Sequence, residues 1–149
     1  MRQRGMSAAR DLSGDVMANL LVVDDEMDMA DCCAEVLRAE GHSVRIARNG
    51  AEGLALVAAE HPDLILLDVE MPVLNGPDMA YRMFLHDVGQ EQIPIVLSSG
   101  VLDLRSLAEQ VGTPYFLGKP FSLKQLLTMV ARALVQRTPP RPRLREEYR

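Results

Sequence analysis

The feature of this sequence that most constrains its fold is an alternation between short apolar runs and longer amphipathic segments. Five runs of three or four residues are apolar or nearly so, and they lie at 20–23, 44–47, 64–67, 95–97 and 115–117. The first, third and fourth are continuous rather than alternating in polarity, as in strands that helices cover on both faces. The runs therefore predict strands in the interior of a sheet.

Helical patterns separate these runs. The first places apolar side chains at three- and four-residue spacing and stops at Gly41, a residue type that commonly follows a helix. Asn49 can cap the second helix, and Ser122 with Gln125 fits a capping box ahead of the fifth. The predicted helices span about 28–40, 49–59, 77–85, 104–111 and 122–135.

Strand and helix alternate five times, and this order predicts an α/β fold with an open parallel sheet and helices on both faces. Right-handed crossovers leave few ways to connect such strands. Ligands of such sheets bind just outside the carboxyl ends of the strands. The residues that follow each apolar run are therefore the first candidates for function.

The length of 149 residues is close to that of one domain, and we expect three segments within it. Residues 1–18 are expected to form a flexible N-terminal extension, 19–136 the folded domain, and 137–149 a basic Pro/Arg-rich tail. The folded domain holds 8 basic and 17 acidic residues, which argues against nucleic-acid binding because phosphate contacts need basic surface. The tail is expected to be disordered and solvated, with a basic binding arm as the alternative.

The sequence also bears on location. No apolar stretch is long enough to cross a bilayer, and the N-terminus carries charge without the apolar region of a signal peptide. The two cysteines, Cys32 and Cys33, are adjacent, and adjacent cysteines rarely form a disulfide with each other. We therefore expect a cytoplasmic protein with reduced thiols and no membrane partner.

Polar residues follow four of the five predicted strands. The carboxyl ends of parallel strands share one edge of the sheet, so these residues are expected to lie together. They comprise three carboxylates, a hydroxyl, an ammonium and two small or rigid residues, namely Asp24, Asp25, Asp68, Ser99, Gly100, Lys119 and Pro120.

This combination of residue types suits phosphoryl transfer to an aspartate. Clustered carboxylates repel one another in a partly buried site, and a hard cation such as Mg²⁺ relieves that repulsion by taking oxygen ligands. A carboxylate beside such a cation can attack a phosphoryl group and form an aspartyl phosphate. The cation, the Lys119 ammonium and the Ser99 hydroxyl can compensate the phosphoryl oxygens, and small Gly100 leaves the group accessible.

Four stretches, taken in order and spacing, resemble the receiver domain of two-component response regulators. They read Leu-Leu-Val-Val-Asp-Asp-Glu, Leu-Leu-Asp-Val-Glu-Met-Pro-Val-Leu-Asn-Gly, Pro-Ile-Val-Leu-Ser-Ser-Gly and Gly-Lys-Pro-Phe. The resemblance covers about residues 19–135. It implies a flavodoxin-like fold, a doubly wound five-stranded parallel sheet in the order 2-1-3-4-5 flanked by five helices.

The resemblance implies an acceptor and a metal site. Asp68 stands at the position of the phosphoacceptor, and Asp25 at that of a direct Mg²⁺ ligand. Asp24 stands where the family's residue acts more through metal-bound water. Asp68 itself and the backbone carbonyl of Glu70 complete the ligand set that the resemblance implies.

The resemblance also implies a switch. Lys119 is expected to contact the phosphoryl group, and the bond to Pro120 is often cis in this family. Ser99 stands at the switch hydroxyl and Phe116 at the switch aromatic position. Tyr115, one residue earlier, is expected to point to the other side of the strand.

Simpler roles remain as alternatives for these residues. Asp25 or Asp28 can cap the first helix, Ser99 can serve as a turn hydroxyl, and Phe116 can be static core. The segment from Ser99 to Lys119 is a little short for the family, so the fourth helix is expected to be truncated or partly irregular.

The leading hypothesis is a stand-alone receiver that takes a phosphoryl group on Asp68 from a histidine kinase or phosphotransfer protein. Phosphorylation would switch a surface toward a downstream protein partner, and a homodimer is compatible with this. Enzymatic activity is expected only as self-phosphorylation and autodephosphorylation. Two other classes are an enzyme with an aspartyl phosphate intermediate, using Glu70 as an acid, and a scaffold or nucleic-acid-binding protein with a vestigial receiver.

Overall fold

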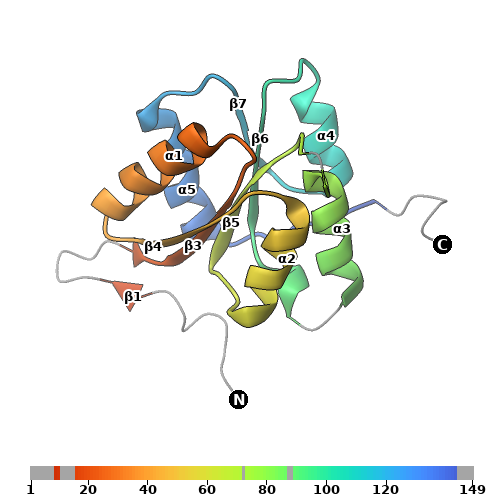
Figure 1. Cartoon of the computed structure of the whole chain (residues 1–149), viewed down its shortest axis with the longest axis horizontal. Helices are drawn as coiled ribbons and strands as arrows, with labels where there is room; N and C mark the ends of the chain where they lie inside the picture. The colour runs from red at the N-terminus through yellow and green to blue at the C-terminus, as the bar shows by residue number, and fades with distance from the viewer. Residues whose placement is uncertain (1–8, 11–15, 72, 87–88, 144–149) are drawn as a thin grey trace.

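Five parallel strands form the central sheet of the protein (Figure 1). The structure is a computed structural model that describes residues 9–10, 16–71, 73–86 and 89–143. The sheet order is β4-β3-β5-β6-β7, which is the order 2-1-3-4-5 expected from the resemblance. Its strands are β3 (Asn19–Val23), β4 (Ser43–Ala47), β5 (Leu64–Asp68), β6 (Ile95–Ser99) and β7 (Tyr115–Gly118).

Among the described residues, five α-helices cover the two faces of the sheet. Figure 1 shows α1 and α5 on one side and α2, α3 and α4 on the other. A 3₁₀ turn, η2 (Gln90–Gln92), precedes β6. The helices are α1 (Met27–Ala39), α2 (Gly50–Ala59), α3 (Gly76–His86), α4 (Leu104–Val111) and α5 (Leu123–Gln136).

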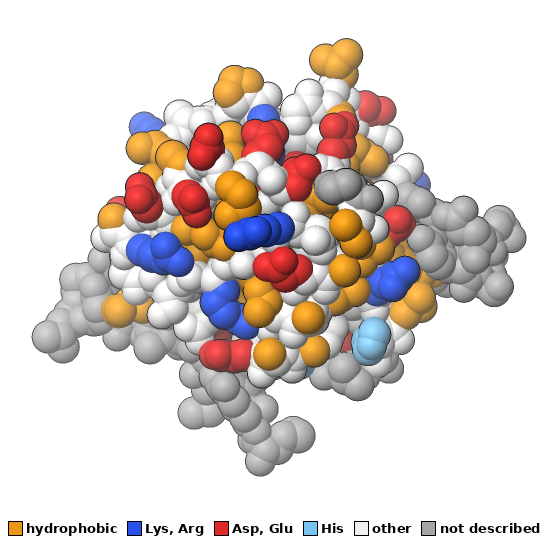
Figure 2. Space-filling view, viewed as in Figure 1, with side chains coloured by type: hydrophobic (Ala, Val, Ile, Leu, Met, Phe, Trp, Pro, Cys, Tyr) orange, Lys and Arg blue, Asp and Glu red, His pale blue; other side chains and the backbone are white. Residues whose placement is uncertain are grey.

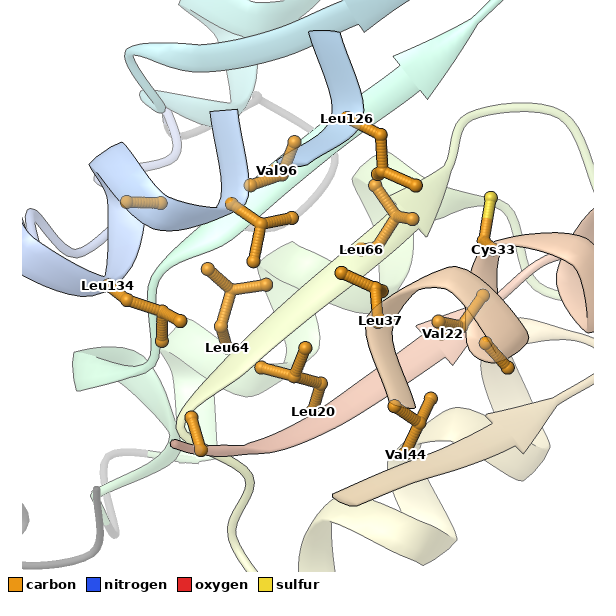
Figure 3. Packing of buried hydrophobic residues seen from close by; sticks show 14 of the residues in the cluster. Leu20, Val22, Cys33, Leu37, Val44, Leu64, Leu66, Val96, Leu126 and Leu134 are labelled. Carbon is orange, nitrogen blue, oxygen red and sulfur yellow. The ribbon is translucent and has the colours of Figure 1, made fainter. Parts of the chain in front are cut away.

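The side chains of each central strand alternate between two apolar layers. On β3, Leu20 and Val22 face α1 and α5, whereas Leu21 and Val23 belong to the layer under α2, α3 and α4. Figure 3 shows the first layer, in which Leu64 and Leu66 of β5 continue the packing of β3. Both faces of these strands are buried, which explains why their sequences are continuously apolar.

Local signals at the helix ends act as expected at two positions. The Asn49 side chain accepts a hydrogen bond from the Glu52 backbone N–H, at 2.8 Å. Ser122 and Gln125 form both hydrogen bonds of a capping box at the start of α5. The capping alternative for Asp25 is wrong, because Glu26 occupies the N-cap position of α1 and makes no side-chain capping bond.

Helix α4 has eight residues, fewer than each of the other described α-helices, which agrees with a truncated helix, and it is regular over that length. It ends at Gly112, which adopts φ 75° and donates its N–H to the Ala108 and Glu109 carbonyls. Leu104, Ala108 and Val111 are buried, so the helix is held by its apolar face on the sheet.

The two terminal segments contain more structure than the sequence indicated. In the N-terminal extension, β1 (Ala9–Arg10) pairs antiparallel with β2 (Val16–Met17), and the rest of residues 1–15 lies outside the described residues. Ala18 is buried in the core, one residue before the expected boundary. In the C-terminal tail, Pro140 and Pro142 are buried, so residues 138–143 pack in part against the domain.

The described helices include none that is long and apolar enough to span a membrane.

A buried ion pair fixes the amino end of the sheet. The Asp63 carboxylate is fully buried and accepts a hydrogen bond from the Asn19 backbone N–H, at 2.8 Å. Arg137, the residue that follows α5, places its guanidinium 3.6 Å from the other Asp63 oxygen. This pair joins the end of the last helix to the loop that precedes β5.

Replacing Asp63 with alanine is expected to lower the free energy of unfolding by roughly 2–4 kcal/mol. The change leaves the Asn19 N–H without its acceptor and Arg137 without its partner. Chemical denaturation measures the loss. Asp31→Ala, at an exposed acid on α1, is the matched control and should change stability by no more than about 0.5 kcal/mol. Equal effects of the two changes would contradict a structural role for the pair.

Candidate functional site

The candidate site lies where the carboxyl ends of β3 and β5 meet. Asp24 directly follows β3, and its backbone N–H donates to the Ala47 carbonyl of β4 at 3.0 Å. Asp68 is the last residue of β5 and lies opposite Ser98 in the register with β6. Acidic side chains gather along the upper edge of the molecule in Figure 2, the edge at which β3 leads into α1 in Figure 1.

Three carboxylates come together at this edge. One oxygen from each of Asp24, Asp25 and Asp68 lies within 4.8 Å of the others. Asp24 and Asp68 are buried, whereas Asp25 is exposed. The Asp24 Oδ1 atom accepts the Glu26 backbone N–H at 2.9 Å, so Asp24 shapes the turn into α1.

Lys119 brings an ammonium group between two of these carboxylates. Its backbone N–H donates to the Ser99 carbonyl at 2.8 Å, which extends the pairing of β6 and β7 by one residue. Its Nζ atom lies 3.0 Å from Asp24 Oδ2 and 3.3 Å from Asp68 Oδ1. The Lys119–Pro120 peptide bond is cis, as the resemblance implies. Lys119 is thus not a surface lysine.

Burial dominates the electrostatics of Asp68. The pKa of the Asp68 carboxyl is raised to about 6, first by desolvation on burial and then by the negative charge of Asp24, against the lowering effect of Lys119. Burial lowers the pKa of Lys119, but the hydrogen bond and charge of Asp24, together with Asp68, outweigh that effect and raise it overall. The site therefore holds one carboxylate that is costly to ionise and one ammonium that stays protonated.

Ser99 and Gly100 form the wall of an open depression over Asp68. Ser99 is buried, and its Oγ atom accepts the Val101 backbone N–H at 3.1 Å. That bond leaves the hydroxyl proton able to donate to a group in the depression. The lining also includes Asp25, Glu26, Met29, Glu70, Met71, Asn75, Val101, Leu107, Lys119 and Pro120.

The floor of the depression is supported from behind by a close backbone approach. The Gly76 N–H donates to the Val69 carbonyl at 3.0 Å, and a Cβ atom at Gly76 would overlap the carbonyl of Asp68. Only glycine therefore lets the start of α3 pack this closely against the end of β5. Asn75 caps α3 by accepting the Asp78 N–H at 2.9 Å.

The two aromatic residues of β7 point to opposite faces of the sheet, as expected. Tyr115 is fully buried in the layer with α1 and α5. Phe116 is half-buried against the other layer, and the Arg105 guanidinium of α4 lies 6.0 Å from its ring centroid. The geometry places Phe116 beside α4, where both the switch and the static-core interpretation remain predictions.

The sequence identified the charged groups of the site but missed how they are connected. The ion pair between Asp24 and Lys119 joins residues 95 positions apart, and no local pattern indicates which of the carboxylates the ammonium contacts. The close approach at Gly76 was also missed, although the Asn75-Gly76 pair marks the turn that contains it. Glu70 is exposed at the rim, and the part played by its backbone carbonyl stays a prediction.

The donor set fits a small divalent cation. Three carboxylate oxygens within 4.8 Å of one another are hard ligands of the kind that Mg²⁺ prefers. Because Asp24 already bonds Lys119 and the Glu26 N–H, exposed Asp25 is the carboxylate with most freedom to take a cation.

Comparison with known proteins agrees with this fold. A family model described as "response regulator receiver domain" matches residues 20–131. The chain belongs to this family. Its place in two-component signalling, as the receiver domain of a response regulator, follows from that membership.

Curated relatives include the response regulator MprA of Mycolicibacterium vanbaalenii, which is 38% identical over 127 residues. That match covers 81% of this chain and 52% of the relative, so this receiver spans about half the length of the curated relatives it matches.

Two solved structures of single receivers are matched over nearly their whole length. The receiver domain of NtrX from Brucella abortus is 30% identical with a TM-score of 0.69, over 78% of this chain and 98% of the other. The chemotaxis response regulator CheY4 of Vibrio cholerae is 28% identical with a TM-score of 0.70, again over 78% and 98%.

The raised pKa of Asp68 predicts a pH-dependent penalty on stability in metal-free buffer. The pKa of about 6 in the folded protein exceeds the ordinary value of 3.8, so the protonated carboxyl favours the folded state below pH 3.8, and this contribution is lost as the pH rises through 6. Asp68→Asn removes the titration and should stabilise the receiver at pH 7 by about 1–3 kcal/mol, but not below pH 4.

Chemical denaturation across this pH range, in the presence of a chelator, measures the difference. Asp31→Asn on exposed α1 should show no comparable rise between pH 4 and 7. A gain from Asp68→Asn that is the same at pH 4 and pH 7 would contradict the assignment of the penalty to this carboxylate.

Proposed function

We propose that this receiver accepts a phosphoryl group on Asp68 in a Mg²⁺-dependent reaction and that the modification switches a partner-binding surface. The observation that carries the proposal is the placement of the Asp68 carboxylate. It lies at the floor of an open depression, 3.3 Å from the Lys119 ammonium and beside two further carboxylates. Few other reactions need an acceptor oxygen with acids on one side and an ammonium on the other.

The reaction is a transfer between an imidazole and a carboxylate. An Asp68 oxygen forms a bond to phosphorus while the bond from phosphorus to the donor histidine nitrogen breaks, and the imidazole leaves with the electron pair and takes up a proton. Attack by water on the aspartyl phosphate then releases inorganic phosphate and restores the carboxylate. The donor would be a histidine kinase or a phosphotransfer protein.

Charge compensation at the transferred group comes from several elements. Lys119 lies within reach of Asp68 and would contact one phosphoryl oxygen. The Ser99 hydroxyl, whose oxygen already accepts the Val101 N–H, keeps its proton to donate to another. Asp24, Asp25, Asp68 and the Glu70 carbonyl would hold Mg²⁺, which when bound neutralises the charge of the carboxylates and phosphoryl oxygens.

The switch would run through Ser99 and Phe116. When the Ser99 hydroxyl turns to bond the phosphoryl group, its hydrogen bond with the Val101 N–H would weaken. Val101 lies in the loop that leads into α4, so this loop would shift. Phe116 of β7 packs on the face of the sheet that α4 covers, beside Arg105 of this helix, so its ring responds to any shift of the helix. A downstream protein partner would then bind the altered surface that α4 and β7 form.

The acceptor is tested by mixing the protein with acetyl phosphate and Mg²⁺ and measuring the mass of the intact chain. We expect a single phosphoryl adduct that is absent in Asp68→Ala and retained in Asp31→Ala, the exposed acid on α1. An adduct that persists in Asp68→Ala would refute the acceptor. Steady turnover of a small phosphoester, without a stoichiometric adduct, would instead favour an enzyme with an aspartyl phosphate intermediate.

The metal site is tested by comparing Asp25→Asn with Asp24→Asn in a Mg²⁺ titration followed by calorimetry. We expect roughly ten-fold weaker binding for Asp24→Asn and a larger loss for Asp25→Asn. Both carboxylate oxygens of Asp24 already accept hydrogen bonds, from Lys119 and from the Glu26 N–H, whereas Asp25 is exposed and lines the depression. A larger loss from Asp24→Asn would contradict the assignment of Asp25 as the direct ligand.

A further inference from the structure

The C-terminal segment of residues 138–143, here called the strap, crosses from one face of the sheet to the other. It begins after α5 and ends beside α3 and α4 (Figure 1). Arg137, which precedes it, adopts φ 54° and is held by the buried carboxylate of Asp63. The strap therefore leaves α5 in a defined direction.

Every backbone N–H of the strap donates to the body of the receiver. Three of its six residues are prolines and have no N–H. The other three, Thr138, Arg141 and Arg143, donate to the Tyr115 hydroxyl at 3.2 Å, the Gly112 carbonyl at 3.1 Å and the Gln110 carbonyl at 2.9 Å. A segment that met the body only by chance would leave some of these donors to water.

Side chains of the strap alternate as in an extended chain. Pro140 and Pro142 are buried, and Arg141 and Arg143 are exposed. Pro142 lines a small cavity with Pro77 and Tyr81 of α3 and Val111 of α4. Pro142 thus supplies apolar contacts to α3 and α4, while the side chains of Arg141 and Arg143 are exposed.

Gly112 lets the strap lie this close to the end of α4. Its positive φ favours glycine, and a Cβ atom at this position would overlap the Arg141 carbonyl. The contact therefore depends on a residue that the end of α4 already requires for its own geometry.

Helix α4 connects the strap to the candidate site. Its eight residues span about 12 Å. In the loop before its start, Val101 lines the depression over Asp68 and donates its N–H to the Ser99 hydroxyl oxygen, and Leu107 within the helix lines the same depression. At its end, the Gln110 and Gly112 carbonyls hold the strap.

We propose that the strap is a latch that holds α4 in the arrangement described here and opposes phosphorylation of Asp68. This inference rests on the proposed function. If the loop between Ser99 and α4 shifts on phosphorylation, α4 shifts with it. This movement would lengthen the hydrogen bonds from the Arg141 and Arg143 N–H groups to the end of α4, so phosphorylation loosens the strap. By reciprocity, loosening the strap favours the phosphorylated form by the same factor.

The first measurement follows amide hydrogen exchange at Thr138, Arg141 and Arg143 by NMR, with and without acetyl phosphate and Mg²⁺. We expect the exchange of Arg141 and Arg143 to become about five-fold faster or more on phosphorylation, and to stay unchanged in Asp68→Ala. Unchanged exchange in a sample whose mass shows the adduct overturns the latch. Absence of the adduct overturns the proposed function instead, and the second measurement then decides on the latch.

The second measurement needs no phosphoryl donor. Pro140→Gly combined with Pro142→Gly removes the buried contacts of the strap, and Arg141→Ala is the control because it changes an exposed side chain and keeps all three donors. We expect faster exchange at Val101, in the loop that leads into α4, in the double variant and not in the control. If the double variant speeds amide exchange in the strap but leaves the exchange of the Val101 amide unchanged, the latch is overturned.

A second variant guards against effects of the proline changes on folding. Gly112→Ala should displace the strap, whereas Gly41→Ala introduces the same kind of strain at φ 101°, where an added Cβ meets only Met17 at an ordinary distance of 3.7 Å. Faster exchange at Arg141 and Val101 is expected for Gly112→Ala alone. Equal behaviour of the two variants would count against the latch.

Discussion

The contact on which the arrangement of the site depends is the pair of bonds from the Lys119 ammonium to Asp24 and Asp68. Two buried carboxylates at neighbouring strand ends repel each other, and without a cation between them one would have to stay protonated. The ammonium comes from the end of β7, so its side chain reaches across the end of β6 to the carboxylates of β3 and β5. The site exists only because four strands end at a common level, which the parallel register of the sheet enforces.

The same sheet explains why the chemistry is confined to one edge. Each central strand presents one apolar layer to α1 and α5 and another to α2, α3 and α4, so neither face has room for a charged side chain. Polar groups can leave the core only beyond the strand ends. At the amino end, Asp63 and Arg137 form an ion pair that joins the end of α5 to the loop before β5. At the carboxyl end, the clustered carboxylates of Asp24, Asp25 and Asp68 lie with the Lys119 ammonium at an open depression, and this excess of negative charge is what a cation or an incoming group can use.

The sequence predicted the strands, the helices and their order because these depend on periodicities that can be read within a dozen residues. Leu20-Leu-Val-Val23 and the Ser122–Gln125 capping box are local signals, and both act as expected. It also predicted which charged residues meet, since they follow the strands directly. What it could not predict depends on distant partners. Lys119 bonds Asp24 across 95 positions, and the Pro-rich tail resembles disordered chain because the carbonyls of Gln110 and Gly112 that order it lie far back in the sequence.

The direction in which the strap runs has a consequence for anything joined to this chain after residue 143. The last described residue lies beside Gln110 at the end of α4 and not beside α5, where the domain's final helix ends. A fused reporter or a further domain would be tethered next to α3 and α4. Its effective concentration would therefore be highest at that surface and low at the opposite face of the sheet. The attachment point, more than the length of a linker, would decide which face of the receiver such a partner meets first.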